Sequence, residues 1–264
     1  MMISTTHDEA QNNRLRWKSY TIRILAAAFW ILVWQLASMW LGQEILLASP
    51  VSVIKKLGEL IVTYDFWKSV GFSFGRIVLG FLLALVTGCI LAVVAYRFSF
   101  AAVLFGPLIT VIKSTPVASF IILCLIWIPS RNLSVFISFL MVLPVVYTNI
   151  LQGIRQTDRK LLEMADIFGV GMGKRICYIY ISQILPYLLT ACTLGLGLCW
   201  KAGVAAEVIG VPSGSIGEKL YHAKVYLNTP DLFAWTIVII VISFLFEKCF
   251  LAGLRAVVGR IEKH

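Results

Sequence analysis

Long apolar runs alternate with short polar stretches along most of this chain. About six of these runs reach or exceed the roughly 20 residues with which a helix crosses the hydrocarbon of a bilayer. They cover approximately residues 21–41, 72–95, 100–128, 133–151, 186–209 and 232–251. Because a lipid-exposed backbone satisfies its hydrogen bonds only in helices or closed barrels, the pattern predicts an all-α membrane protein.

Composition supports this prediction. Of 264 residues, 59% are hydrophobic and 14% are charged, which is more apolar surface than one soluble core of this size buries. The net charge of +10 raises the alternative of nucleic-acid binding. The basic residues flank apolar runs instead of forming one basic stripe, so we exclude nucleic acid as a partner and expect a lipid bilayer.

The distribution of Lys and Arg predicts the orientation in the membrane. Basic residues are in excess before the first run, in the segment 152–182 and after the last run. Cytoplasmic segments retain such charges, so both termini are predicted to be cytoplasmic. We divide the chain into a cytoplasmic tail, 1–20, and a single transmembrane domain, 21–264. The first run is too long for a signal peptide and is taken as a retained helix.

Two stretches between the runs are predicted to lie outside the cell. Ser49 and Pro50 have the signature of a helix start, and the residues after them alternate at helical spacing, which favours an amphipathic helix on the outer surface. Residues 210–231 are rich in Gly, Pro and Ser and are predicted to form an outer loop. The fifth span is predicted to start at Pro186.

Charged and helix-breaking residues inside the apolar runs are candidates for a translocation pathway. The third run is interrupted at Lys113, Ser114, Thr115 and Pro116, where proline removes a backbone donor. Irregular backbone at membrane depth is tolerated only beside protein or water. Lys201 and Glu207 add charge within the fifth run. The lysines either form a positive lining for an anion or neutralise helix ends.

The segment 161–169 in the long inner stretch is amphipathic. Its apolar side chains would be exposed to water unless another surface packs against them. Ala165 and Gly169 are four residues apart, so a helix would place them on one face beside Ile167 and Phe168. Exposed apolar groups on a cytoplasmic helix need a partner. The alternative is that this helix packs back on its own bundle.

No set of residues typical of catalysis or of a metal site stands out. The three histidines are scattered and no pair of cysteines has metal-ligand spacing. The glycines at 169–173 lack the spacing of a phosphate-binding loop. We therefore expect no catalytic residues, no metal and no cofactor in this chain, and a membrane enzyme is disfavoured.

Several motifs resemble the permease subunits of bacterial ATP-binding-cassette importers of the nitrate/sulfonate/taurine branch. The inner-loop pattern of that family stands here as Glu163-Met164-Ala165, then Gly169, then Ile179-Tyr180-Ile181-Ser182, with Met164 and Ser182 departing from it. The other matching stretches lie within residues 45–220. They are Leu47-Ala48-Ser49-Pro50, Ser73-Phe74-Gly75-Arg76, Lys113-Ser114-Thr115-Pro116, Leu185-Pro186, Trp200-Lys201 and Ala205-Ala206-Glu207.

The resemblance implies a type I importer permease bundle in the bacterial cell membrane. The loop 153–183 would carry a coupling helix seated on a separate cytoplasmic ATP-binding subunit, which alone would bind ATP. A second copy of the chain and an extracytoplasmic solute-binding protein would complete the importer. The coupling residues would be Glu163, Met164, Ala165, Asp166, Phe168 and Gly169.

The cargo and the energy source leave alternatives open. Lys113 and Lys201 favour a small anion such as a sulfonate or a nitrate-like compound. Related branches suggest a vitamin precursor or another neutral aromatic solute. An ion-coupled secondary transporter is a further alternative, although the two matching halves typical of such proteins are not visible.

Overall fold

All regular structure in the described part of the chain is helical. The structure is a computed structural model that describes residues 4–261. Its elements are α1 (Ser4–Leu41), α2 (Pro50–Ile61), α3 (Tyr64–Arg97), α4 (Ser99–Ser114), α5 (Val117–Cys124), α6 (Ser130–Arg155), α7 (Arg159–Ile167), α8 (Met172–Arg175), the π-helical turn η1 (Ile176–Tyr180), α9 (Ile181–Gly210), α10 (Ile216–Val225) and α11 (Thr229–Ile261).

Helix length and composition agree with a multi-pass membrane protein. Within residues 4–261, five helical stretches are long and apolar enough to span a membrane, and α4 with α5 makes a sixth if this bent pair is one span. The prediction of an all-α membrane protein with about six spans is therefore confirmed.

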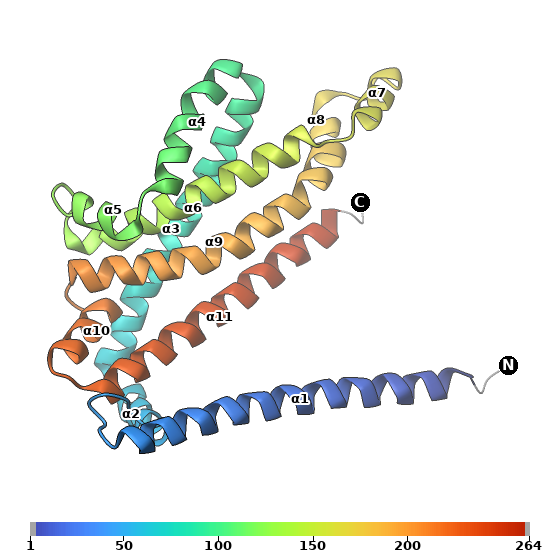
Figure 1. Cartoon of the computed structure of the whole chain (residues 1–264). Helices are drawn as coiled ribbons and strands as arrows, with labels where there is room; N and C mark the ends of the chain where they lie inside the picture. Colours follow the sequence, from blue (N-terminus) through green and yellow to red (C-terminus); the bar gives the residue numbers. More distant parts are fainter. Residues whose placement is uncertain (1–3, 262–264) are drawn as a thin grey trace. The chain divides into compact units, whose positions relative to one another are not determined.

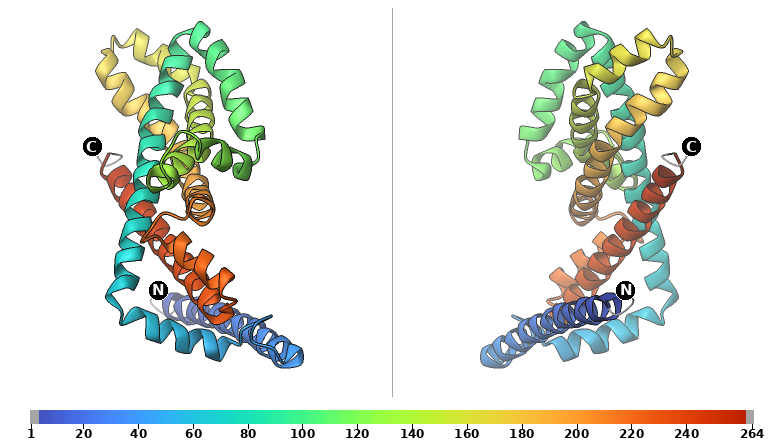
Figure 2. Two further views of the ribbon diagram at one scale, coloured as in Figure 1. Left: turned by 90° about the vertical axis from the view of Figure 1, so that its left-hand side faces the viewer. Right: turned by 90° about the vertical axis from the view of Figure 1, so that its right-hand side faces the viewer.

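The predicted interruption of the third run is a sharp bend. The axes of α4 and α5 differ by 103°, and Thr115 and Pro116 lie between the two helices (Figures 1 and 2). Pro116 has no amide hydrogen, so the backbone cannot continue the helix through it. The hydroxyls of Ser114 and Thr115 donate to the carbonyls of Thr110 and Val111 at 3.0 and 2.8 Å. The Val111 carbonyl also accepts from the Thr115 amide at 3.0 Å, so the hydroxyls add second bonds to carbonyls in the last turn of α4.

The described chain forms two compact units. The larger unit comprises residues 62–222 and 235–264, and the smaller unit comprises residues 1–61 and 223–234. The core of the larger unit is built mainly from α3, α6 and α9, which supply buried residues such as Phe81, Val142 and Leu196. Phe250 of α11 adds an edge-to-face contact with Phe81, with ring centroids 5.2 Å apart.

Small residues bring the core helices of the larger unit close together. A Cβ atom on Gly203 of α9 would lie 2.6 Å from both Ile77 Cγ1 of α3 and Ser138 Oγ of α6. Gly80 of α3 similarly abuts the Val135 carbonyl of α6. Small side chains permit close helix contacts in membranes, where van der Waals packing drives association. These three helices therefore form a tightly packed scaffold.

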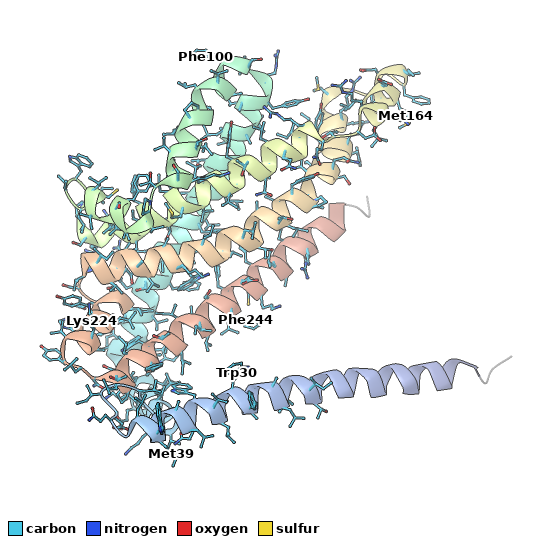
Figure 3. The ribbon with its side chains drawn as sticks, viewed as in Figure 1. Trp30, Met39, Phe100, Met164, Lys224 and Phe244 are labelled. Carbon is cyan, nitrogen blue, oxygen red and sulfur yellow. The ribbon has the colours of Figure 1, made fainter. Side chains whose placement is uncertain are left out.

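The smaller unit contains α1, α2 and the turn between them. The Trp34 indole N–H donates to the Ala48 carbonyl at 3.0 Å, and the Ser38 hydroxyl donates to the Leu47 carbonyl at 3.0 Å. Most of the other apolar side chains that the structure describes in α1, from Ile22 to Leu41, are exposed, among them Trp30 and Met39 (Figure 3). Such a surface suits lipid. Helix α1 starts at Ser4 and has no break at residue 20, where the predicted tail ends.

Several predicted boundaries differ from the structure, and three of the differences matter here. The second span begins at Tyr64 instead of residue 72. The predicted outer loop 210–231 contains α10, because Ser215 caps this helix by accepting from the Glu218 amide at 3.0 Å. Pro186 lies inside α9 instead of starting it, and η1 precedes that helix. Local π-helical adjustments are one way in which membrane helices accommodate proline.

Candidate functional site

The predicted coupling segment forms a short helix with defined ends. Helix α7 is capped by the Asp158 carboxylate, which accepts from the Lys160 amide at 2.9 Å. At its other end, Gly169 has a φ of +61°, the left-handed region that glycine adopts without a steric penalty. The amides of Gly169 and Val170 donate to the carbonyls of Asp166 and Ala165 at 3.1 and 2.9 Å, which is the Schellman pattern.

This geometry corrects one detail of the sequence interpretation. Ala165 and Gly169 were expected to share a helical face, but α7 ends at Ile167 and the chain reverses at Gly169. Ala165 is buried, with 2% of its surface exposed. Gly169 lies beyond the helix, so its role at this site is to end α7 and not to flatten its face.

Arg175 holds the end of α7, and sequence reasoning had not singled it out. Its Nε donates to the Val170 carbonyl at 2.6 Å, and its Nη2 donates to the Ala165 carbonyl at 3.3 Å. Its Nη1 also forms an ion pair with Asp166. The planar guanidinium can make these bonds together. In the sequence, Arg175 follows Lys174 in a basic stretch. That stretch predicts the orientation in the membrane but indicates no specific contact for Arg175.

The rest of this segment presents apolar side chains outward. The exposed fractions are 49% for Met164, 84% for Ile167 and 76% for Phe168. Figure 3 shows Met164 at the tip of the larger unit, where α7 projects from the ends of α6 and α9. Glu163 is also exposed. An apolar face of this kind is typical of a protein-binding surface, and it does not pack back on its own bundle within the described chain.

The pathway candidates at the bend lie between α4 and α5. Lys113 is exposed, and its Nζ lies 3.5 Å from the Thr148 hydroxyl of α6. Ser114 and Pro116 are exposed and Thr115 is half-buried. The two hydroxyls bond to α4 itself, so Lys113 is the member of this group that offers a charge to a solute. Lys201 is exposed on α9.

Glu207 lies in a different environment from the two lysines. Its side chain is fully buried. Its Oε2 accepts from the Ser73 hydroxyl of α3 at 2.6 Å and from the Gly217 amide of α10 at 3.3 Å. The Ser73 hydroxyl in turn accepts from the Ile216 amide at 2.9 Å. Glu207 therefore joins α3, α9 and the start of α10, and it does not line an open surface of this chain.

Ser73 is the second residue whose role the sequence did not reveal. It stands in the stretch Ser73-Phe74-Gly75-Arg76 that carried part of the family resemblance, but nothing local indicates a partner. Ser73 and Glu207 are 134 positions apart. Only the packing of α3 against α9 brings them together.

Comparison with known proteins agrees with this architecture. Residues 77–263 match the family described as "Binding-protein-dependent transport system inner membrane component". The chain is 26% identical to the putative aliphatic sulfonates transport permease protein SsuC of Bacillus subtilis (strain 168), over 83% of this chain and 80% of the relative.

Two further relatives are similar over most of their length. The taurine transport system permease protein TauC of Escherichia coli (strain K12) is 25% identical over 97% of this chain and 95% of its own. The nitrate import permease protein NrtB of Synechococcus elongatus is 25% identical over 78% of this chain and 77% of its own. These matches favour an importer permease over an ion-coupled secondary transporter. The chain belongs to the family of inner membrane components of binding-protein-dependent transport systems.

Proposed function

We propose that this chain is the membrane-spanning subunit of an ATP-driven importer and that it moves small anions into a bacterial cell. The observation that carries this proposal is the apolar end of α7, where Ile167 and Phe168 are exposed in a chain of this family. A separate cytoplasmic ATP-binding subunit would cover this face. ATP hydrolysis would take place in that subunit, and this chain would bind no nucleotide.

The same proposal sets the orientation. If α7 binds a cytoplasmic ATPase, both termini lie in the cytoplasm, and the end of the larger unit that holds Glu207 and α10 faces outward. A binding protein would deliver the solute there, and two copies of the chain would form the pathway. The excess of Lys and Arg in the segment 152–182 supports this orientation.

An anionic cargo is supported by two observations. The names of the relatives refer to sulfonates, taurine and nitrate, all of which carry an anionic oxygen group. Lys113 and Lys201 place exposed cationic side chains on apolar helices, where an unpaired charge is costly unless it faces a cavity or a partner.

The coupling role is tested by substituting Gly169. Gly169→Val adds a side chain that meets nothing within 4 Å in this chain, but a β-branched residue at a φ of +61° is strained by roughly 1–2 kcal/mol. We expect the end of α7 to change and ATP-driven uptake in proteoliposomes to fall at least about tenfold, a change of about 1.4 kcal/mol in coupling.

Gly173→Val is the matched control, because Gly173 lies in the same loop, has open space around it and has an ordinary φ. The control should retain uptake and co-purification of the ATPase. If Gly169→Val transports like the wild type, the coupling assignment is wrong. If no ATPase co-purifies with the wild-type chain, the proposal that this chain is a subunit of an ATP-driven importer is wrong.

The cargo is tested with Lys201→Ala. Removing this exposed cation should raise the KM for an anionic cargo by roughly threefold to tenfold, since an interaction with one charged group contributes about 1 kcal/mol or more. The uptake of a neutral aromatic solute should not depend on it. An unchanged KM for the transported anion would favour the neutral alternative.

A further inference from the structure

A cavity at the end of the larger unit opposite α7 belongs to neither the coupling segment nor the predicted pathway. It is open to one side, has a volume of about 610 Å³ and is formed by the first turns of α3, the start of α6 and the segment that follows α9. Its lining residues are Lys68, Phe72, Ser130, Arg131, Val211, Pro212, Ser213 and Gly214.

The charges at this cavity are all positive. Lys68 and Arg131 line it, and the lining includes no carboxylate. Neither side chain forms an ion pair in the described chain. A third cation lies next to them, since Arg76 donates to the Arg131 carbonyl and stacks 4.2 Å from the centroid of the Phe72 ring. Like charges gathered in a concave site attract a counter-ion.

The start of α6 adds to this positive potential. The helix has 26 residues, and its N-cap position is occupied by Pro129, which provides no side-chain cap. The N-terminal end of such a helix carries a partial positive charge and free amides that favour an anion. Arg131 lies in this first turn, so its charge and the helix end act on the same volume.

The opposite wall of the cavity is held in place without a ligand. Gly214 has a φ of +81°, and its amide donates to the Glu218 carboxylate at 2.6 Å. The Glu218 carboxylate, which is close to the cavity, is therefore engaged by the cavity wall itself. Glu207 and Ser73 bind the amides of Gly217 and Ile216, which follow this wall directly. A site that is organised before binding loses less entropy when it is filled.

We infer that this cavity binds a small oxyanion, a sulfonate-like or phosphate-like group, between Lys68 and Arg131. Its position at the outward end rests on the proposed function. Two sources share this chemistry: an anionic solute on its way to the pathway and the headgroup of an anionic phospholipid. In both cases Lys68 and Arg131 recognise the charged oxygens, and Ser130 and Ser213 are within the same lining.

The test uses the complex of permease and ATPase in nanodiscs of phosphatidylcholine, titrated calorimetrically with sodium ethanesulfonate. The wild type should bind this probe. In the double variant, Lys68→Gln with Arg131→Gln, the Kd for ethanesulfonate should rise at least about tenfold, because two charged hydrogen-bond donors are lost. Lys224→Gln is the matched control, since Lys224 is exposed on α10 and does not line the cavity (Figure 3). The control should bind like the wild type.

A second arm distinguishes the two sources. In nanodiscs that contain phosphatidylglycerol, native mass spectrometry measures the lipid retained by each variant. If the wild type retains phosphatidylglycerol, the double variant loses it and ethanesulfonate displaces it, the occupant is the lipid headgroup. If the wild type binds ethanesulfonate but retains no lipid, the occupant is the solute. If the double variant binds ethanesulfonate and retains lipid like the wild type, the inference is wrong. Co-purification of the ATPase with that variant shows that the proposed function is unaffected.

Discussion

The end of α7 exposes 84% of Ile167 and 76% of Phe168, whereas Glu207, near the opposite end of the larger unit, is fully buried. The first region consists of local structure: a capped helix of nine residues, a left-handed glycine and one arginine that binds the carbonyls behind it. The second consists of contacts between α3, α9 and α10, which are distant in sequence.

The difference indicates how force would pass through the protein. The proposed partner would act on the exposed apolar side chains of α7, and a displacement there would have to pass to a scaffold in which Gly203 lies against Ile77 and Ser138. Densely packed cores transmit displacement and do not absorb it. The cavity lined by Lys68 and Arg131 lies at the end of the larger unit opposite α7, and the segment that follows one wall of it is held by Glu207.

The largest effect is expected from overfilling the scaffold. Gly203→Val places a side chain against Ile77 and Ser138, which would lie 2.6 Å from its Cβ, so α9 must move away from α3 and α6. Overpacking of this kind costs roughly 1–3 kcal/mol or more, and we expect a lower Tm in detergent and less monodisperse protein. Gly197→Val on the same helix has open space and should leave the Tm unchanged. Equal Tm values for the two variants would refute the tight scaffold.

An intermediate effect is expected at Glu207. Glu207→Ala leaves the Ser73 hydroxyl and the Gly217 amide without their acceptor, which costs about 1–3 kcal/mol for a buried group. Hydrogen exchange should rise in residues 211–217 while the middle of α6 keeps its protection. Glu207→Gln retains one acceptor oxygen, so its hydrogen exchange in residues 211–217 should lie between that of the wild type and that of Glu207→Ala. Unchanged exchange in 211–217 would show that the carboxylate does not hold this segment.

The smallest effect on stability is expected at Arg175. Arg175→Gln removes the bonds to the carbonyls of Val170 and Ala165 and the ion pair with Asp166, all near the surface, so the global Tm should change little. The orientation of α7 should loosen, and stimulation of the ATPase by the permease should fall by roughly twofold to fivefold, about 0.4–1 kcal/mol. Lys174→Gln alters the neighbouring exposed cation and serves as control. A stimulation equal to that of the control would exclude Arg175 from coupling.

Much of the fold was predictable because its signals are local. The apolar runs predicted the spans, and Pro116 predicted the bend because proline removes an amide wherever the chain goes. The pattern from Glu163 to Gly169 predicted a short helix with exposed apolar side chains, and its coupling role stays a prediction. Helix α10 was missed because Gly, Pro and Ser are frequent in residues 210–215, directly before it, although Ser215 and Glu218 three residues later are a capping signal.

The sequence by itself determined that this chain crosses a membrane several times, where the third run breaks and that the segment before Gly169 presents apolar residues, since length, apolarity and proline act within a few residues. Only the tertiary structure decided that Glu207 is buried and bonded to Ser73, that Arg175 binds a carbonyl at the end of α7 and that Lys68 and Arg131 line the same cavity. Hydrogen bonds and cavities need atoms within a few ångströms of one another, and the packing of distant helices alone sets those distances.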